Sequence, residues 1–190
     1  MRTLRTARLR LTPVTVRNAD TLWQILQAPD LREFQDLPRV GRGGFRTMVA
    51  KRPKRLTPAA SGRFEWLIGS DDVPGPVGWV SLRITEVEGH CGEIGYSVTR
   101  EHRKRGIATE AVRALVAEAF REGALERVNA YCLPENLPSR RVLERVGFDE
   151  GVLVHHGASV SGRPVDVLHC VLERERWIQS ANSIEISASA

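Results

Sequence analysis

A cationic loop containing one glycine comes directly before a segment whose apolar residues recur at the spacing of an amphipathic helix. The loop and the first residues of the repeat are Arg103, Lys104, Arg105, Gly106, Ile107, Ala108 and Thr109. The first N–H groups of a helix lack intrahelical partners, and the helix dipole makes that end positive. Because a glycine has no Cβ to block approach, such groups can surround a phosphate. The loop is a candidate pyrophosphate site, and a solvated basic turn is the plain alternative.

Two polar residues begin the next expected helix. Asn136 and Ser139 precede an apolar repeat that ends at Gly147, a residue that favours helix termination. Asn and Ser at such a position often serve only as N-caps. Gly95, on the strand before the cationic loop, is a further candidate: it either marks a bulge that splays this strand from the next or makes room for a bulky neighbour.

Hydrophobic periodicity predicts the elements that must position these residues. Strands are expected over residues 8–14, 63–68, 77–84, 91–98, 127–133, 151–156 and 165–172. Helices are expected from Thr15 to before Pro29, around 31–37, over 107–121 and over 137–146. The three strands from 63 to 98 should form an antiparallel meander. The Gly- and Pro-rich stretch 39–60 should form a mobile loop over a substrate site.

Length and element order together predict the fold class. A chain of 190 residues, 42% hydrophobic and 27% charged, can build one sizeable core. The order predicts an α+β fold with a mixed, mostly antiparallel sheet of about seven strands and flanking helices. We expect one domain over residues 1–178 and a disordered tail of small residues over 179–190.

The composition argues against several classes of protein. The three cysteines, Cys91, Cys132 and Cys170, are widely spaced and odd in number, so they predict neither a disulfide framework nor a metal-binding pair. No segment approaches the roughly 20 apolar residues of a membrane span, and the N-terminus lacks the apolar core of a secretory signal. We therefore expect a cytoplasmic protein without a metal site or a membrane partner.

The two candidate loops resemble the signatures of a known family. Arg103-x-x-Gly106-x-Ala108, between a strand and a long helix, is similar to the acyl-CoA pyrophosphate loop of the GNAT superfamily of N-acetyltransferases. Asn136-x-x-Ser139, followed by a helix and Gly-Phe, resembles that family's second signature. The element order over residues 6–173 is also similar. The resemblance implies a single GNAT-like domain with acetyl-CoA as co-substrate.

The resemblance also implies how the coenzyme is held. The segment 103–109 would bind the pyrophosphate, and Asn136 would bind the pantetheine arm. The arm would also pair with free backbone groups near Tyr96, Ser97 and Val98, whose N–H groups would donate to the oxyanion of the tetrahedral intermediate.

Two residues gain catalytic roles from the resemblance. Glu93, in Glu93-Ile-Gly-Tyr, would accept the amine proton through water; a half-buried glutamate paired with an arginine is the structural alternative. Many members place a general-acid tyrosine where this chain has Leu143. The sequence is most similar to the branch of ribosomal-protein N-terminal (serine/alanine) acetyltransferases, and that branch implies Ser139 as the proton donor to the leaving thiolate. A covalent role for Cys91 or Cys132 is disfavoured.

Charge is distributed unevenly along the chain. The net charge is +5, but residues 1–63 hold 14 Lys/Arg against 4 Asp/Glu, whereas residues 64–190 hold 14 against 19. The first third contains a basic segment without an intervening acid, made of Arg39, Arg42, Arg46, Lys51, Arg52, Lys54 and Arg55. Such a segment either binds an anionic partner or simply solvates a loop.

Three hypotheses of function follow. The first is an N-acetyltransferase that moves an acetyl group from acetyl-CoA to a primary amine of a peptide, a protein N-terminus or a small molecule, by direct attack in a ternary complex. The second is an acyltransferase of the same fold that uses or modifies RNA through the basic segment, and the third is a noncatalytic acyl-CoA-binding module. The acceptor is unidentified, and we expect it to contact residues 20–60 and the last hairpin.

Overall fold

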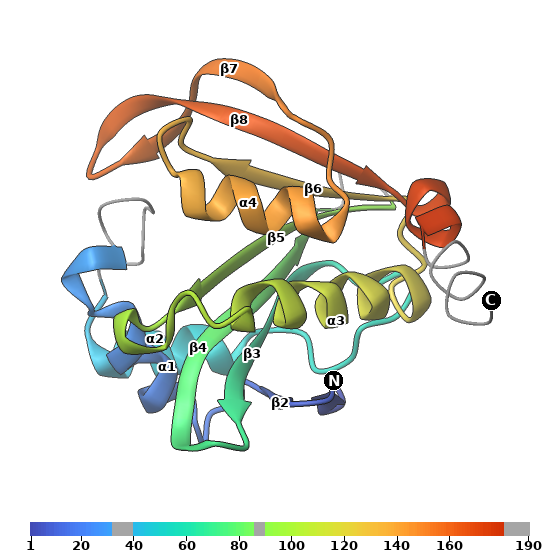
Figure 1. Cartoon of the computed structure of the whole chain (residues 1–190). Helices are drawn as coiled ribbons and strands as arrows, with labels where there is room; N and C mark the ends of the chain where they lie inside the picture. Colours follow the sequence, from blue (N-terminus) through green and yellow to red (C-terminus); the bar gives the residue numbers. More distant parts are fainter. Residues whose placement is uncertain (32–39, 86–89, 181–190) are drawn as a thin grey trace.

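A computed structural model describes residues 1–31, 40–85 and 90–180 and shows one eight-stranded sheet in the order β1-β2-β3-β4-β5-β6-β8-β7 (Figure 1). The strands are β1 (Leu4–Arg5), β2 (Leu9–Pro13), β3 (Gly62–Ser70), β4 (Val73–Ile84), β5 (Cys91–Val98), β6 (Arg127–Cys132), β7 (Val152–Val160) and β8 (Arg163–Glu173). The helices are α1 (Ala19–Leu26), α2 (Arg42–Ala50), α3 (Ile107–Arg121) and α4 (Leu137–Val146), with short 3-10 turns η1 (Pro29–Leu31) and η3 (Arg100–His102).

The sheet is mixed and mostly antiparallel, as predicted. β5 and β6 run parallel, and the other neighbouring strands pair antiparallel. The additional strand is β1, where Leu4 and Arg5 pair with Leu11 and Arg10. Two residues carry too little periodicity to be recognised in the sequence, and their pairing with β2 is what makes them a strand. The α+β fold class is confirmed.

The second helix lies later in the chain than predicted. The helix expected around 31–37 falls, beyond its first residue, outside the described residues, and α2 forms inside the stretch interpreted as a loop. Phe45 and Val49, four residues apart, are buried on one side of α2. Gly43 and Gly44 conceal this pattern, because glycine has low helix propensity. Burial of that apolar face outweighs the propensity.

The first helix begins at Ala19 rather than after Thr15. The Asn18 side chain accepts a hydrogen bond from the Thr15 N–H (2.7 Å) and donates one to the Pro13 carbonyl (3.0 Å). These two bonds hold residues 15–18 in a turn, which is a common use of Asn. From Ala19 onward the buried residues recur at helical spacing.

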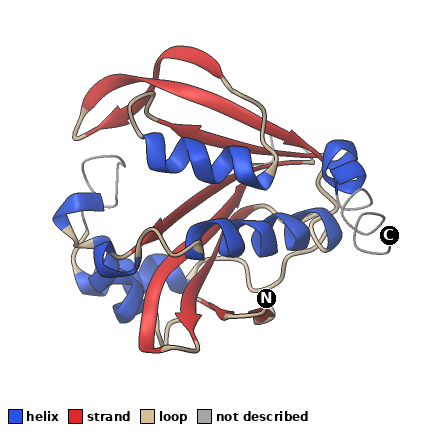
Figure 2. Ribbon diagram, in the orientation of Figure 1, coloured by secondary structure: helices blue, strands red, loops and turns tan. Residues whose placement is uncertain are grey.

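Helices cover both faces of the sheet. α3 and α4 lie on one face (Figure 2), where fully buried Leu115 packs in the same core as Phe64 and Leu82 of the strands. α1 and α2 pack on the other face against Leu67 and Trp79. Burial of each such side chain contributes about 1.5–3 kcal/mol relative to exposure. α1 and α2 cover only one end of their face, so the rest of that face remains open for a site.

The last hairpin is longer than predicted. β7 and β8 turn at Ser161 and Gly162, which both have positive φ angles (53° and 78°), as a two-residue hairpin turn requires. β8 is followed by a helical segment over 174–180, which includes the first two residues of the predicted tail, 179–190; the rest of that tail, 181–190, lies outside the described residues. Within the described ranges, no helix combines the length and the apolar character needed to cross a membrane.

Candidate active site

The sheet opens between its two parallel strands. β5 pairs with β6 only from Cys91 to Ile94, and beyond Ile94 the strands separate. The pairing of β5 with β4, by contrast, continues without a bulge to Val98. The opening therefore begins at Gly95, where the sequence predicts a splay, and it arises from the divergence of β6 (Figure 1).

A cavity of about 830 Å³ occupies this opening and continues across the open face of the sheet. Its lining brings together the opening (Gly95 and Tyr96), the start of α4 (Asn136 and Ser139), and Glu93. The first helices and the last hairpin also contribute residues, namely Leu26, Phe45, Arg52, Ala158, Ser159, Val160, Ser161 and Gly162. The structure thus places the predicted acceptor-binding segments along the same cavity as the predicted catalytic residues.

Backbone groups of β5 face the opening. The Thr99 N–H donates to the Val77 carbonyl of β4 (2.9 Å), and alternate strand residues direct their backbone groups to opposite sides. Ser97, which pairs with Trp79, therefore faces β4, while Tyr96 and Val98 face the gap left by β6. The Val98 carbonyl accepts a hydrogen bond from Arg103 Nε (2.9 Å). The groups placed to meet a pantetheine arm or an oxyanion are consequently those of Tyr96 and the N–H of Val98.

The predicted pyrophosphate loop leads into α3 as expected. Gly106 has φ = +77°, a left-handed conformation that glycine adopts without strain. The Glu110 N–H donates the first intrahelical bond, to the Gly106 carbonyl (3.1 Å), so the N–H groups of Ile107, Ala108 and Thr109 precede it. These three N–H groups are the unpaired donors that an anion at the start of a helix requires.

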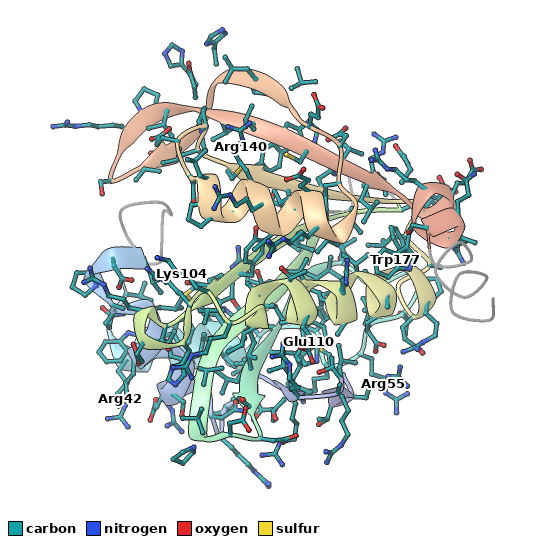
Figure 3. The ribbon with its side chains drawn as sticks, in the orientation of Figure 1. Arg42, Arg55, Lys104, Glu110, Arg140 and Trp177 are labelled. Atoms are coloured by element: carbon teal, nitrogen blue, oxygen red, sulfur yellow. The ribbon has the colours of Figure 1, made fainter. Side chains whose placement is uncertain are left out.

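The three cations of the loop are not equivalent. Arg103 is held by the Val98 carbonyl and by an ion pair with Asp30 in η1. Lys104 and Arg105 are exposed, and Figure 3 labels Lys104 beside the start of α3. Arg103 therefore connects the loop to β5 and to the N-terminal region. Lys104 and Arg105 remain the side chains accessible to a phosphate.

The start of α4 is tied to the opening by two hydrogen bonds. Asn136 is the N-cap: its Oδ1 accepts from the Ser139 N–H (3.2 Å). The Tyr96 hydroxyl, from β5, donates to the Ser139 carbonyl (3.1 Å). Burial raises the pKa of Tyr96 well above its ordinary value, so the phenol stays protonated and can donate. These bonds leave the Ser139 side chain beside the cavity.

Glu93 lies on the open face of the sheet and forms an ion pair with Arg83. The two residues are directly opposite each other on β5 and β4. Their pairing is the structural alternative that the sequence left open. The side chains of Glu93 and Tyr96, three residues apart on one strand, project to opposite faces. A reacting group in the opening would therefore have the Glu93 carboxylate on one side and α4 on the other.

Gly95 makes room for a tryptophan. A Cβ at this position would lie 2.9 Å from Ser81 Oγ and 3.5 Å from the ring of Trp79. The glycine therefore leaves room for the Trp79 indole beside β5. Room for a bulky neighbour is therefore observed at Gly95, whereas the predicted bulge is not, because the pairing of β5 with β4 is continuous there.

Sequence reasoning missed a charged cluster in the cavity wall. Glu65 on β3 is 2% exposed and pairs with Arg52 and with Arg63 (3.4 Å). Burial lowers the pKa of the Arg52 guanidinium, and the Glu65 carboxylate opposes that shift. The available signal was the pattern Arg63-x-Glu65, which puts two charges on one face of a strand otherwise rich in apolar residues.

The basic segment is less free than its composition suggests. Arg42 and Arg46 both pair with Asp20 of α1, the latter at 3.1 Å, and Arg52 is the buried partner of Glu65. Lys51, Lys54 and Arg55 are exposed, while Arg39 lies outside the described residues. Much of this charge therefore holds α1, α2 and β3 together.

The three cysteines and the possible metal ligands are placed as follows. Cys91, Cys132 and Cys170 are free thiols, and Cys132, although 8% exposed, lines the cavity. Across the described ranges, no three His, Cys, Asp or Glu side chains converge as metal ligands would.

Comparison with known proteins identifies the family. A family model described as an acetyltransferase (GNAT) domain matches residues 8–149. The uncharacterized N-acetyltransferase p20 of Bacillus licheniformis is 30% identical over 177 residues, which cover 92% of this chain and 98% of that protein.

Solved structures share the fold. A ribosomal-protein-S5-alanine acetyltransferase from Vibrio fischeri superposes with a TM-score of 0.77 at 18% identity, over 93% of this chain and 99% of that one. RimJ of Mycobacterium smegmatis, solved with a CoA-disulfide, gives a TM-score of 0.70 at 24% identity, over 95% and 93%. The family match extends over both predicted motifs and over β5 and β6, the strands that border the opening. The chain therefore belongs to the GNAT family of acetyltransferases.

Proposed function

We propose that the protein transfers the acetyl group of acetyl-CoA to the primary amine of a peptide or protein N-terminus, or of a small molecule, within the β5/β6 opening. The observation that carries this proposal is the convergence on one cavity of the β5 backbone at Gly95 and Tyr96, the Ser139 hydroxyl and the Glu93 carboxylate. The N–H groups of residues 107–109 would hold the pyrophosphate, with Lys104 and Arg105 beside it. Asn136 and the backbone of Tyr96 would hold the pantetheine arm.

The residues divide the proton transfers between the two faces of the sheet. The amine nitrogen attacks the thioester carbonyl carbon, and the N–H groups of Tyr96 and Val98 stabilise the oxyanion that forms. Glu93 accepts a proton from the nitrogen through water. The C–S bond then breaks, and the Ser139 hydroxyl supplies a proton to the thiolate. The proton held by Glu93 returns through water to Ser139, so the balance is one acetylated amine and one free CoA thiol.

Release of free thiol tests this proposal. Acetyl-CoA is incubated with a library of peptides, amino acids and polyamines, and each positive reaction is checked by mass spectrometry for an acetylated product. We expect thiol release that requires an acceptor, together with an unmodified enzyme after exposure to acetyl-CoA alone. Tight CoA binding without thiol release for any amine would instead favour a noncatalytic binding module.

The basic segment supports a second and weaker hypothesis, in which the partner is RNA. Ion pairs occupy Arg42, Arg46 and Arg52, and the other members of the segment that the structure describes, Lys51, Lys54 and Arg55, are exposed. An RNA partner stays a prediction of the sequence. The same thiol assay with total tRNA added tests it, since binding through phosphates would weaken steeply with salt.

We also propose a cytoplasmic location. The cysteines Cys91, Cys132 and Cys170 are free thiols, the form that a reducing compartment maintains.

A further inference from the structure

Two arginines lie side by side on the open face of the sheet, next to the proposed base. Arg63 on β3 is directly opposite Arg83 on β4, which in turn is directly opposite Glu93 on β5. Like charges directly opposite each other on neighbouring strands destabilise a sheet. Both guanidinium side chains line the cavity, and they are 40% and 50% exposed. This arrangement has a cost that an anion between or above the two arginines would offset.

Arg63 and Arg83 have more N–H donors than the glutamates of the cavity accept from. A guanidinium carries five N–H donors. Among the described residues, Arg63 donates to Glu65 (3.4 Å) and Arg83 to Glu93. Arg52, from the buried side, pairs with the other carboxylate oxygen of Glu65. The outward-facing donors of Arg63 and Arg83 are therefore available to a ligand.

Among the described residues that line the cavity, positive charge is in surplus. The charged ones are Arg52, Arg63, Arg83, Glu65 and Glu93. The Trp79 indole Nε1 adds a buried donor for which the described residues supply no acceptor. A cationic acceptor would meet a surplus of like charge here, whereas a carboxylate would meet two guanidinium groups of the kind that bind it bidentately.

From these contacts we infer that the acceptor is an amine that also carries a carboxylate, bound by Arg63 and Arg83 while the amine lies near Glu93. Neighbouring strands are about 4.8 Å apart, so the backbones of Arg83 and Arg63 lie about 5 and 10 Å from that of Glu93. The carboxylate is consequently within about 10 Å of the reacting nitrogen. This inference rests on the proposed acetyl transfer and names the class of its acceptor.

Matched acceptors test the inference. The full-length protein is assayed with acetyl-CoA and peptides that begin Ser-Asp, Ser-Asn or Ser-Lys and are otherwise identical. Serine and serinamide form a second arm, which separates an α-carboxylate from an acidic side chain as the recognised group. We expect kcat/KM to be about tenfold higher with the carboxylate than with its amide in at least one arm, because charged hydrogen bonds are stronger than neutral ones.

Variants show whether Arg63 is responsible. Arg63→Gln should abolish the preference mainly through KM, while Arg63→Lys should retain part of it. Arg17→Gln serves as the control, because Arg17 is exposed in the turn before α1. Equal use of acid and amide acceptors, or a preference for the lysine peptide, would overturn the inference while leaving acetyl transfer intact. Absence of thiol release with every acceptor would overturn the proposed function and this inference together.

Discussion

Ser139 makes two hydrogen bonds through its backbone, and its side chain is separate from both. Its N–H donates to Oδ1 of Asn136, the N-cap of α4, and its carbonyl accepts from the Tyr96 hydroxyl. The hydroxyl Oγ takes part in neither bond. A change confined to the side chain therefore tests chemistry, whereas a change at Asn136 or Tyr96 tests placement.

Replacement of the Ser139 hydroxyl should lower turnover without lowering stability. For Ser139→Ala we expect kcat to fall about 100-fold, the usual scale of a lost proton donor, with little change in the KM for acetyl-CoA. Asn136→Ala is the matched control: loss of the N-cap should cost about 1 kcal/mol of unfolding free energy. Steady-state kinetics and thermal melts of both variants measure the difference. Unchanged kcat in Ser139→Ala would remove this hydroxyl from the mechanism.

Tyr96 should act as a positioning residue for Ser139. Tyr96→Phe removes the hydroxyl that donates to the Ser139 carbonyl at 3.1 Å, and loss of one such hydrogen bond costs about 1 kcal/mol. We expect a lower denaturation midpoint and a lower kcat, with a pH profile of the same shape as in the wild type. A profile that loses a limb would instead show that the phenol itself transfers a proton.

At the scale of elements, the glycine before α3 has a conformational and a steric role. Gly106→Ala should cost about 1 kcal/mol of stability because of its positive φ, and the new Cβ would lie 3.4 Å from Arg8 Nη2. It should also weaken coenzyme A binding, measured by calorimetry. Gly75→Ala is the control, since Gly75, near the start of β4, has φ = +86° and open space around it. Equal coenzyme affinity in both variants would argue against the loop as the pyrophosphate site.

The segment after α2 is anchored to β3 by a buried ion pair. Removal of one partner of such a pair typically costs about 3–5 kcal/mol, because the other charge is left uncompensated. Arg52→Gln should therefore reduce the unfolding free energy by about 3 kcal/mol, somewhat moderated by Arg63. The double variant Arg52→Gln/Glu65→Gln should recover part of that loss in urea denaturation. A double variant less stable than the single one would show that the two residues act independently.

Across the whole molecule, the N-terminal segment is docked on α3 through a carboxylate. Burial alone would raise the pKa of Glu110, but hydrogen bonds from Thr6 and Arg8 outweigh it, and the net shift is downward. A folded-state pKa below the unfolded value of about 4.3 means that ionised Glu110 stabilises the fold above that pH. This contribution disappears as the pH falls through the folded-state pKa.

Glu110→Gln should consequently be less stable than the wild type at neutral pH and equally stable in acid. Denaturation midpoints measured from about pH 7 down to about pH 3 should converge below the pKa of the carboxyl group. Glu175→Gln, at an exposed position, is the control and should show no such convergence. A stability difference that persists at low pH would mean that the Glu110 contacts do not depend on its charge.

The sequence predicts the fold and the coenzyme loop more completely than it predicts the acceptor side of the site. Alternation and helical spacing predict β5, α3, β6 and α4 closely, because each buries one regular apolar face. The sequence pattern does not predict α2, because its buried face consists of Phe45 and Val49 in a segment that contains two glycines. The pattern Arg63-x-Glu65 indicates charge on this face of β3, but it does not identify Arg52, 13 residues before Glu65, as the partner.

A crystal structure of the acetyl-CoA complex tests the central claim most directly. With the coenzyme seated in the β5/β6 opening, the pyrophosphate should contact the N–H groups of residues 107–109. The thioester oxygen should then lie within hydrogen-bonding distance of the N–H groups of Tyr96 or Val98, with the sulfur beside Ser139. A coenzyme bound elsewhere, or a thioester remote from both Glu93 and Ser139, would contradict the account.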